Sequence, residues 1–414
     1  MRRVVITGLG ALTPIGNNVS DFWQNCLDGV SGAGPITKFD ASKFKTQFAC
    51  ELKDFDPVDY LDKKELRRLD PFSQYALIAA DEAIADSKMD FESLNTERIG
   101  VIWGSGNGGL RTFEQNMEDY LKGDGTPKFS PFLIPKMIVD IAAGVISIKH
   151  GLKGINYAPI SACASSTTAI VDAFNYIRWG KADAIIAGGS DMAITESGIG
   201  GFSSAKALSV RNDDPKTASR PFDVDRDGFV MGEGAGALVV EEYEHAKARG
   251  AKIYAEVVGG GMCADAYHLT ATHPEGDGAF RGMKLALEDA QIEPEQLDYL
   301  NLHATSTPVG DGCELIAVEK LFGRDTKLKM SGTKSMTGHL LGAIGAIEAI
   351  VCVKSCETNK IPATINTQNP DQKMTKGFDV IFGDSIASEV NYAMSNTFGF
   401  GGHIATVLFK KFIN

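Results

Sequence analysis

Cysteine is scarce in this sequence and is not arranged in pairs. The chain has seven cysteines among 414 residues, an odd number, and no two of them form a Cys-x-x-Cys motif. This pattern favours neither a disulfide framework nor a zinc site. It fits a reducing compartment, so we expect a cytoplasmic protein.

Positive charge and long apolar runs are also in short supply. The 41 Lys and Arg residues are outnumbered by 53 Asp and Glu residues, which gives a formal net charge of −12. This acidic balance argues against a nucleic-acid partner. The apolar stretch Leu340 to Val353 is shorter than the roughly 20 residues of a membrane-spanning helix, and it contains Glu348. We therefore expect no insertion into a membrane.

The N-terminal segment lacks the features of two common motifs. Its apolar run is broken by Gly8, Gly10 and Pro14, so we expect a first strand from Arg2 to Gly8 rather than a signal peptide. Two glycines after a strand are typical of a dinucleotide fingerprint, but Thr13 stands where the third glycine would be. Nucleotide binding is therefore not expected.

Predicted helices and strands alternate along the chain, which is typical of a mainly parallel α/β protein. A helix from Phe72 to Ser87 precedes a strand from Ile99 to Trp103, and a helix from Phe280 to Ala290 precedes a strand from Tyr299 to Leu302. The two helices end alike, in EAIADSKM and LALEDAQI. This faint repeat suggests two similar halves, with chance similarity between amphipathic helices as the alternative.

A boundary between these halves is expected near Gly250. The segment Glu241 to Arg249 predicts a charged, exposed helix that Gly250 can cap, and a new strand is expected within Lys252 to Val258. The predicted domains are therefore residues 1–250 and 251–414.

Cys163 stands at a predicted junction between a strand and a helix. An extended apolar run, Ile155 to Ile160, precedes it, and apolar residues recur at helical spacing after it. The positive end of the helix dipole would lower the thiol pKa and favour the nucleophilic thiolate. The alternative is a structural cysteine, because most cysteines are small buried hydrophobes.

Two histidines could work with such a nucleophile. His303 ends a predicted strand, and functional groups gather at the carboxyl ends of parallel strands. His339 begins the predicted helix from Leu340, where the dipole favours a neutral imidazole that can donate a hydrogen bond to an oxyanion. A structural histidine is the alternative for His339.

Glu348 lies in the same apolar helix and needs a partner if it is buried. Lys334, just ahead of the helix, is the natural candidate, either as a support for the site or as half of a purely structural pair. Near the C-terminus, glycines surround Phe398 and Phe400. They suggest a loop that approaches a ligand and moves, or else a plain turn that holds core phenylalanines.

In combination, these motifs resemble the β-ketoacyl-acyl-carrier-protein synthases, and the chain is most similar to the type II elongating members. The resemblance covers essentially the whole chain and is carried by the segments VVITGLGALTPIG, SACASS, AGGSDM, RPFD, GEGAG, HATSTPVGD, TKSMTGHLLGA and SNTFGFGG. It implies an α/β, thiolase-like fold with two duplicated halves in five α-β-α-β-α layers, and a homodimer.

The resemblance also implies the chemistry of a condensing acyltransferase that elongates fatty acids by two carbons, with no metal or organic cofactor. Cys163 would take the acyl group as a thioester. His303 and His339 would stabilise the enolate left when malonyl-carrier loses carbon dioxide. The backbone amides of Cys163 and Phe400 would form the oxyanion hole, and Phe400 would gate the two half-reactions.

The remaining site residues are implied in the same way. Lys334, paired with Glu348, would maintain the electrostatic environment of the site. The substrate would be bound by Thr305, Thr307, Thr270, Asn107 and Phe202. Asn107 stands where the family usually has an apolar residue of the acyl pocket, which disfavours a long saturated chain unless the amide is paired or turned away. Ile404 stands where the family usually has asparagine, so a hydrogen bond that steadies the mobile loop is expected to be missing.

The implied partner, an acyl carrier protein loaded with acyl or malonyl groups, is acidic. A basic docking surface is expected on one predicted helix, extended by Lys206, and its residues are Lys63, Lys64, Arg67 and Arg68. Acidic residues are interleaved with them, so a solvated helix face is the alternative.

Three other functions are alternatives to fatty acid elongation. A ketosynthase of a polyketide or aryl-polyene pathway would share this site. A thiolase would use a second cysteine as a base, and the C-terminal glycine-rich loop offers none. A non-catalytic chain-length factor would lack the nucleophile, whereas Cys163, His303 and His339 are all present.

Overall fold

The computed structural model describes residues 1–413, and most of its strands form one eleven-stranded sheet. From the middle outward, one side of the sheet contains β1 (Val4–Leu12), β7 (Gly234–Glu242), β6 (Ala184–Asp191), β4 (Ile99–Gly104) and β5 (Asn156–Tyr157). The other side contains β8 (Ala255–Ala264), β15 (His403–Lys411), β14 (Tyr392–Gly399), β9 (Tyr299–Asn301), β10 (Lys329–Ser331) and β12 (Asp379–Val380). Two small sheets pair β2 (Gly34–Pro35) with β3 (Phe48–Ala49) and β11 (Lys360–Ile361) with β13 (Ile386–Ala387).

The two sides of the large sheet repeat one pairing pattern. On one side β1 and β7, then β7 and β6, are antiparallel, whereas β6 and β4, then β4 and β5, are parallel. On the other side β8, β15, β14, β9 and β10 follow the same sequence of pairings. The sides meet where β1 and β8 pair over a short stretch, from Val4 opposite Val257 to Ile6 opposite Ala255. The repeat expected from sequence is therefore present in the fold.

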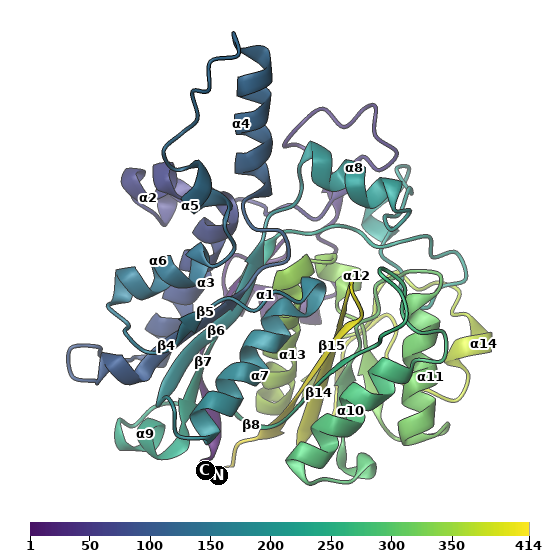
Figure 1. Ribbon diagram of the computed structural model, residues 1–414. Helices are drawn as coiled ribbons and strands as arrows, with labels where there is room; N and C mark the ends of the chain where they lie inside the picture. The colour runs from purple at the N-terminus through teal and green to yellow at the C-terminus, as the bar shows by residue number, and fades with distance from the viewer. Residues whose placement is uncertain (414) are drawn as a thin grey trace.

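Helices cover both faces of each half and produce five layers (Figure 1). The middle layer holds α7 (Ser165–Arg178) and α13 (Ile344–Thr358), which share one core with strands from both halves. One outer layer holds α3 (Pro71–Ser87) and α6 (Ile141–His150), and the other holds α10 (Asp277–Ala290) and α11 (Gly310–Phe322). The other helices are α1 (Val19–Leu27), α2 (Lys63–Arg68), α4 (Leu110–Lys122), α5 (Leu133–Met137), α8 (Glu196–Ser204), α9 (Tyr243–Ala248), α12 (Lys334–Thr337) and α14 (Gln372–Thr375).

The ends of α3 and α10 show why the two halves resemble each other in sequence. Asp70 caps the start of α3, because its side chain accepts from the Phe72 amide, and Pro71 supplies a fixed first-turn backbone. Lys88 caps the end of α3 and Gln291 caps the end of α10, each in the left-handed region, with φ of 54° and 56°. These two residues hold matching positions in EAIADSKM and LALEDAQI. The shared helix ending is a structural feature of both halves.

Three expectations need correction. The sheet is mixed rather than mainly parallel, because β1, β7, β8 and β15 have only antiparallel neighbours. The predicted exposed helix from Glu241 begins at Tyr243, and Glu241 is a fully buried strand residue that binds Arg249 and His245. The extended run before Cys163 contains only the short strand β5.

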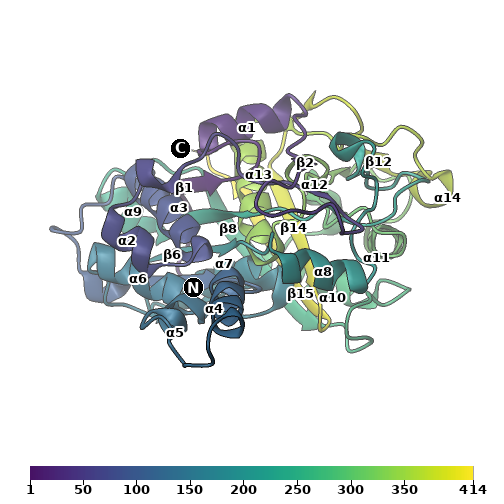
Figure 2. The ribbon, with the colours of Figure 1, turned by 90° about the horizontal axis from the view of Figure 1, so that it is seen from above.

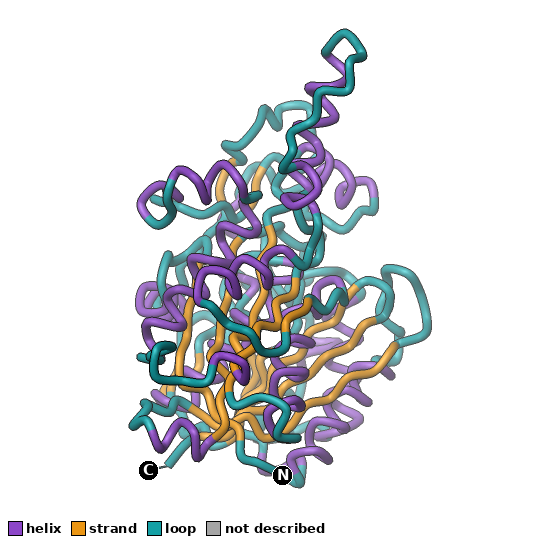
Figure 3. The backbone as a smooth tube through the Cα atoms, turned by 60° about the vertical axis from the view of Figure 1, so that its left-hand side comes forward, coloured by secondary structure: helices purple, strands orange, loops and turns teal. Residues whose placement is uncertain are grey.

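Many of the loops that follow the strands lie at the upper end of the molecule. Figure 3 shows the strands running side by side toward loops at this end, and Figure 1 shows α4 projecting above the body. Within residues 1–413, no helix is both long and apolar enough to cross a membrane.

Candidate active site

Cys163 lies in a single 3-10 turn, Ala162–Ala164, directly before α7. Ala162 has φ of 52°, a left-handed conformation that is unusual for a residue with a side chain. The Ser165 hydroxyl donates to the Ala162 carbonyl at 2.7 Å and accepts from the Ser161 amide at 3.0 Å. The small residues of this segment therefore allow a tight, strained turn that holds the sulfur at the start of a helix.

The electrostatics at Cys163 differ from the sequence expectation of a thiolate. Burial, and then the negative charge of Asp191, raise the pKa of the Cys163 thiol to about 12. The positive charge of Lys334 and hydrogen bonds from the backbone amides of Phe400 and Cys163 oppose this rise. The resting sulfur is therefore a thiol, and the expectation of a lowered pKa was wrong because it considered only the helix dipole.

A cavity of about 410 Å³ reaches Cys163. Its wall includes His303, His339 and Phe400, so the structure brings together the four residues expected around the reacting atoms. Five further expected residues line the same cavity, namely Thr270, Thr305, Thr307, Phe202 and Lys206.

The imidazoles of His303 and His339 stand close together, with ring centroids 5.5 Å apart and planes at 86°. Both rings are nearly inaccessible, and in residues 1–413 both Nδ1 atoms are buried without a hydrogen-bond partner. Burial, followed by the positive charge of Lys334, lowers the pKa of both rings well below the ordinary histidine value. Two neutral imidazoles therefore face the cavity. Burial, rather than the helix dipole, is the main cause of their lowered pKa.

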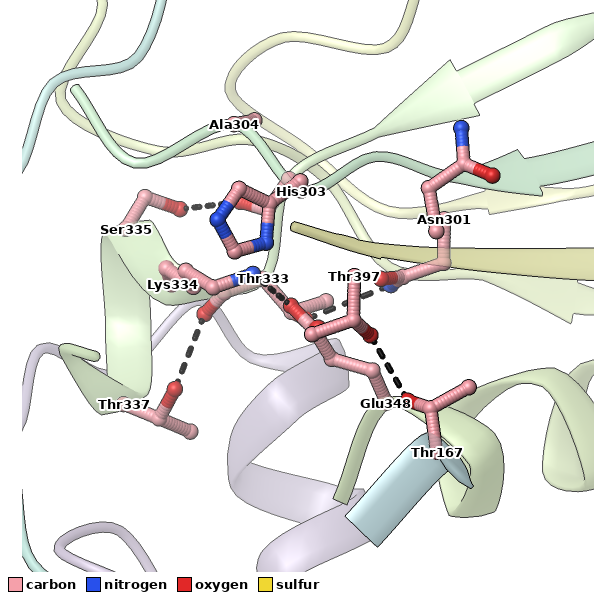
Figure 4. Close-up of polar contacts among 12 residues, drawn as sticks. Thr167, Asn301, His303, Ala304, Thr333, Lys334, Ser335, Thr337, Glu348 and Thr397 are labelled. Carbon is pink, nitrogen blue, oxygen red and sulfur yellow. Dashed lines mark hydrogen bonds and ion pairs between the residues drawn. The ribbon is translucent and has the colours of Figure 1, made fainter. Parts of the chain in front are cut away.

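Lys334 and Glu348 form the predicted pair. The Nζ atom of Lys334 donates to Oε1 of Glu348 at 2.6 Å, and both side chains are inaccessible to solvent. Burial raises the pKa of Glu348 to about 7, while Lys334 opposes the rise. Figure 4 shows the pair below the ring of His303, with Thr167 and Thr397 bonded beside it. The pair does not line the cavity, so it can act on the histidines only through its charge.

Glu314, which the sequence analysis did not identify, fixes the loop that carries His303. Its two carboxylate oxygens accept from the backbone amides of His303 at 2.8 Å and of Ala304 at 2.9 Å. Asn396 donates to the same carboxylate at 3.2 Å. The sequence did offer a signal for Glu314, namely a carboxylate on the apolar side of a helix, which is the same signal that pointed to Glu348.

Comparisons with known proteins decide the family. Residues 1–246 match the "Beta-ketoacyl synthase, N-terminal domain" family and residues 254–368 match the "Beta-ketoacyl synthase, C-terminal domain" family. The chain belongs to the β-ketoacyl synthase family. Two relatives called 3-oxoacyl-[acyl-carrier-protein] synthase 2 are similar over nearly their whole length. The protein from Synechocystis is 49% identical over 99% of this chain and 98% of its own, and that from Staphylococcus aureus is 50% identical over 99% of both.

Solved structures place this β-ketoacyl synthase in the thiolase-like fold. A β-ketoacyl synthase from Burkholderia phymatum superposes with a TM-score of 0.92 at 35% identity, over all of both chains. A ketosynthase bound to the hexaketide, in complex with its type II PKS acyl-carrier protein, superposes with a TM-score of 0.90 at 30% identity, over 99% of this chain and all of that chain.

Asn107 lies outside the cavity wall in this β-ketoacyl synthase. Its side-chain amide faces the buried carboxylate of Asp191 at 3.4 Å, and its backbone amide donates to the same carboxylate at 3.0 Å. The side-chain amide of Asn107 is therefore paired with a carboxylate. A paired amide does not disfavour an apolar acyl chain in the way that an unpaired one would.

Ile404, the second departure, lines the cavity and packs against α10, where a methyl group added to Gly282 would lie 2.6 Å from it. Backbone hydrogen bonds join the glycine-rich loop to the neighbouring loop instead. The Gly401 amide donates to the Leu269 carbonyl at 2.7 Å, and the Asp265 amide donates to the Gly402 carbonyl at 2.7 Å.

The basic residues expected to dock the carrier fall into two groups. α2 is capped by Asp62 and exposes Lys63, Lys64, Arg67 and Arg68. Lys206 is exposed just after α8, at the cavity. Figure 1 and Figure 2 both show α2 apart from α8, so these residues do not form one continuous patch.

Proposed function

We propose a division of labour among the residues of this cavity for the reaction of a 3-oxoacyl-[acyl-carrier-protein] synthase. The chain is an acyltransferase of fatty acid elongation, as its 49–50% identity to type 2 synthases over nearly its whole length indicates. The observation that carries the assignment of roles is the convergence of Cys163, His303, His339 and Phe400 on one cavity.

In the first half-reaction, the sulfur of Cys163 attacks the thioester carbonyl of an acyl-carrier. The carbonyl oxygen becomes an oxyanion, and the backbone N–H groups of Cys163 and Phe400, two residues of the cavity wall, stabilise it. Collapse of this intermediate expels the carrier thiol, which takes up the proton lost from Cys163. The acyl group remains as a thioester on Cys163.

In the second half-reaction, malonyl-carrier loses carbon dioxide and leaves an enolate. No strong base is needed, because the departing carboxylate supplies the electron pair. His303 and His339 are neutral and can each donate one hydrogen bond to the enolate oxygen. The enolate carbon attacks the acyl thioester and expels the Cys163 thiolate, which gives a 3-oxoacyl product two carbons longer. The thiolate takes up a proton from water and returns to the resting thiol.

Thr270, Thr305 and Thr307 bind the pantetheine arm in this proposal. All three line the cavity, and the hydroxyls of Thr305 and Thr307 lie 3.1 Å apart. Lys334 lowers the pKa of both histidines, and Glu348 holds Lys334 in place. Phe202 and Phe400, with ring centroids 6.1 Å apart, gate the path between the arm and the acyl chain.

The carrier protein docks on the exposed basic face of α2 and at Lys206 in this proposal, because acidic carriers complement both. A second copy of the chain covers the edge of the sheet at β5, after which Ile160 is exposed. We place the boundary between the two halves at residues 250 and 251 and the protein in the cytoplasm.

Substitution of the nucleophile tests the proposed roles. Cys163→Ala is expected to abolish condensation of malonyl-carrier with acyl-carrier and to leave the circular dichroism spectrum unchanged, because alanine fits the small-residue turn. Cys263→Ala, which removes the other partly exposed cysteine, is the matched control. Undiminished condensation by a folded Cys163→Ala variant would contradict the proposed role of Cys163.

A further inference from the structure

Asp191 is a buried carboxylate at the carboxyl end of β6 that the reaction scheme leaves without a role. Its Oδ1 atom accepts from the Ser105 hydroxyl at 2.8 Å and the Asn107 amide at 3.0 Å. Its Oδ2 atom accepts from the Gly106 amide at 2.8 Å and the Gly342 amide at 2.6 Å. One carboxylate thus binds the loop that follows β4 in the first half and the turn that precedes α13 in the second.

Both bound segments lie against the nucleophile turn. A methyl group added to Gly106 would stand 3.6 Å from the carbonyl oxygen of Ala162, the neighbour of Cys163. A methyl group added to Gly342 would stand 2.3 Å from the Gly106 amide nitrogen, so only glycine fits between the two segments. The turn that contains Gly342 also follows His339 closely along the chain. Asp191 therefore connects the supports of the nucleophile and of one histidine.

The hydrogen-bond geometry around Asp191 suits an ionised carboxylate. Burial raises the pKa of Asp191 above its ordinary value, and hydrogen bonds from Gly106, Ser105, Asn107 and Gly342 oppose the rise. Each carboxylate oxygen already faces two donors, and the Ser105 hydroxyl is itself fixed as a donor because it accepts from the Gly108 amide at 3.0 Å. A protonated carboxyl would press its O–H against these donors.

The charged group that opposes Asp191 at the sulfur is Lys334, and His303 and His339 are neutral. We propose that Asp191 is a positioning residue of this synthase: its buried carboxylate holds the loop after β4 and the turn before α13 against the nucleophile turn. The negative charge held beside this turn also opposes ionisation of the Cys163 thiol. This inference rests on the proposed role of Cys163.

Alkylation of Cys163 by iodoacetamide at a series of pH values tests the inference, because alkylation needs no substrate and so remains informative if the proposed function fails. The Asp191→Asn variant removes the charge, so its profile of rate against pH is expected to shift about one pH unit lower, with about tenfold faster alkylation at pH 8. Mass spectrometry of the Cys163 peptide gives the rate. Condensation is expected to fall at least about tenfold, because two amide donors lose their acceptor.

Glu233→Gln is the matched control, since Glu233 is an equally buried carboxylate bonded to Lys38 and Tyr75 rather than to the nucleophile's supports. Its alkylation profile is expected to coincide with that of the wild type. If Asp191→Asn does not fold, Ser105→Ala, which leaves the charge less compensated, is expected to shift the profile to higher pH. A folded Asp191→Asn variant with an unshifted profile, or an unshifted Ser105→Ala profile in its place, overturns the proposal.

Discussion

At the scale of single residues, burial and then nearby charges determine the state of each reacting group. Burial and Asp191 favour the protonated thiol of Cys163, while Lys334 and two backbone amides favour the thiolate. The same Lys334 charge acts with burial on His303 and His339 to keep both imidazoles neutral. The site therefore holds its nucleophile and its hydrogen-bond donors uncharged before substrate arrives.

The neutrality of the two histidines can be measured directly. We expect the Cε1 resonances of His303 and His339 to keep their neutral positions from pH 8 to pH 6 in protein labelled on histidine, because the pKa of each ring lies well below its ordinary value near 6.5. Spectra of the single His→Asn variants assign the signals. A titration of either ring with a midpoint near pH 6.5 would show that a charged imidazole exists at neutral pH.

Local sequence patterns were sufficient to select Cys163, His303 and His339, which the structure places around one cavity, because each precedes a recognisable helix or follows a recognisable strand. They were insufficient for the electrostatics. Asp191 and Glu314 act on the site through backbone amides of distant segments, and only the folded chain places them there. For that reason the sequence analysis predicted a lowered thiol pKa where burial and a carboxylate raise it.

At the scale of elements, α13 is the packed centre of the molecule. All its residues from Ile344 to Val353 are buried, and its core includes strands from both halves. The apolar run in the sequence predicted a buried helix, and the structure confirms it. The sequence pattern did not show that the helix begins only at Ile344, after the turn at Leu341 with φ of 51°.

Truncation within α13 should destabilise the protein strongly. Ile347→Ala is expected to lower the free energy of unfolding by about 2–5 kcal/mol, because Ile347 is fully buried and the rigid surroundings cannot close the cavity. Chemical denaturation measures the difference. Ile316→Ala, on an exposed face of α11, is the matched control and should lower the free energy of unfolding far less. Equal losses for the two variants would contradict the central position of α13.

At the scale of the whole molecule, the duplicated α/β halves present their loops at one end, where the cavity and the basic groups lie. The repeated helix endings, EAIADSKM and LALEDAQI, predicted two similar α/β halves. Strand direction could not be predicted, because β5, β9 and β10 are two or three residues long and antiparallel pairing at β1, β7, β8 and β15 depends on distant partners.

Carrier docking is a property of the surface and should depend on charge. The double variant Lys63→Glu and Lys64→Glu is expected to raise KM for acyl-carrier about tenfold at low salt and to leave kcat with a small acyl thioester unchanged, because α2 is remote from the cavity wall. Steady-state kinetics with both substrates separate the two effects. Lys327→Glu, an exposed lysine of the other half, is the control. An unchanged KM for acyl-carrier would show that the basic face of α2 is only solvated and does not dock the carrier.

In the proposed mechanism, Cys163 carries the acyl group between the two half-reactions. Mass spectrometry of the protein after incubation with acyl-carrier alone, and then with malonyl-carrier, tests this role directly. We expect an added acyl mass on the peptide that contains Cys163, released as 3-oxoacyl-carrier when malonyl-carrier is supplied. An acyl mass on any other residue, or an acyl mass on Cys163 that malonyl-carrier does not remove, would contradict it.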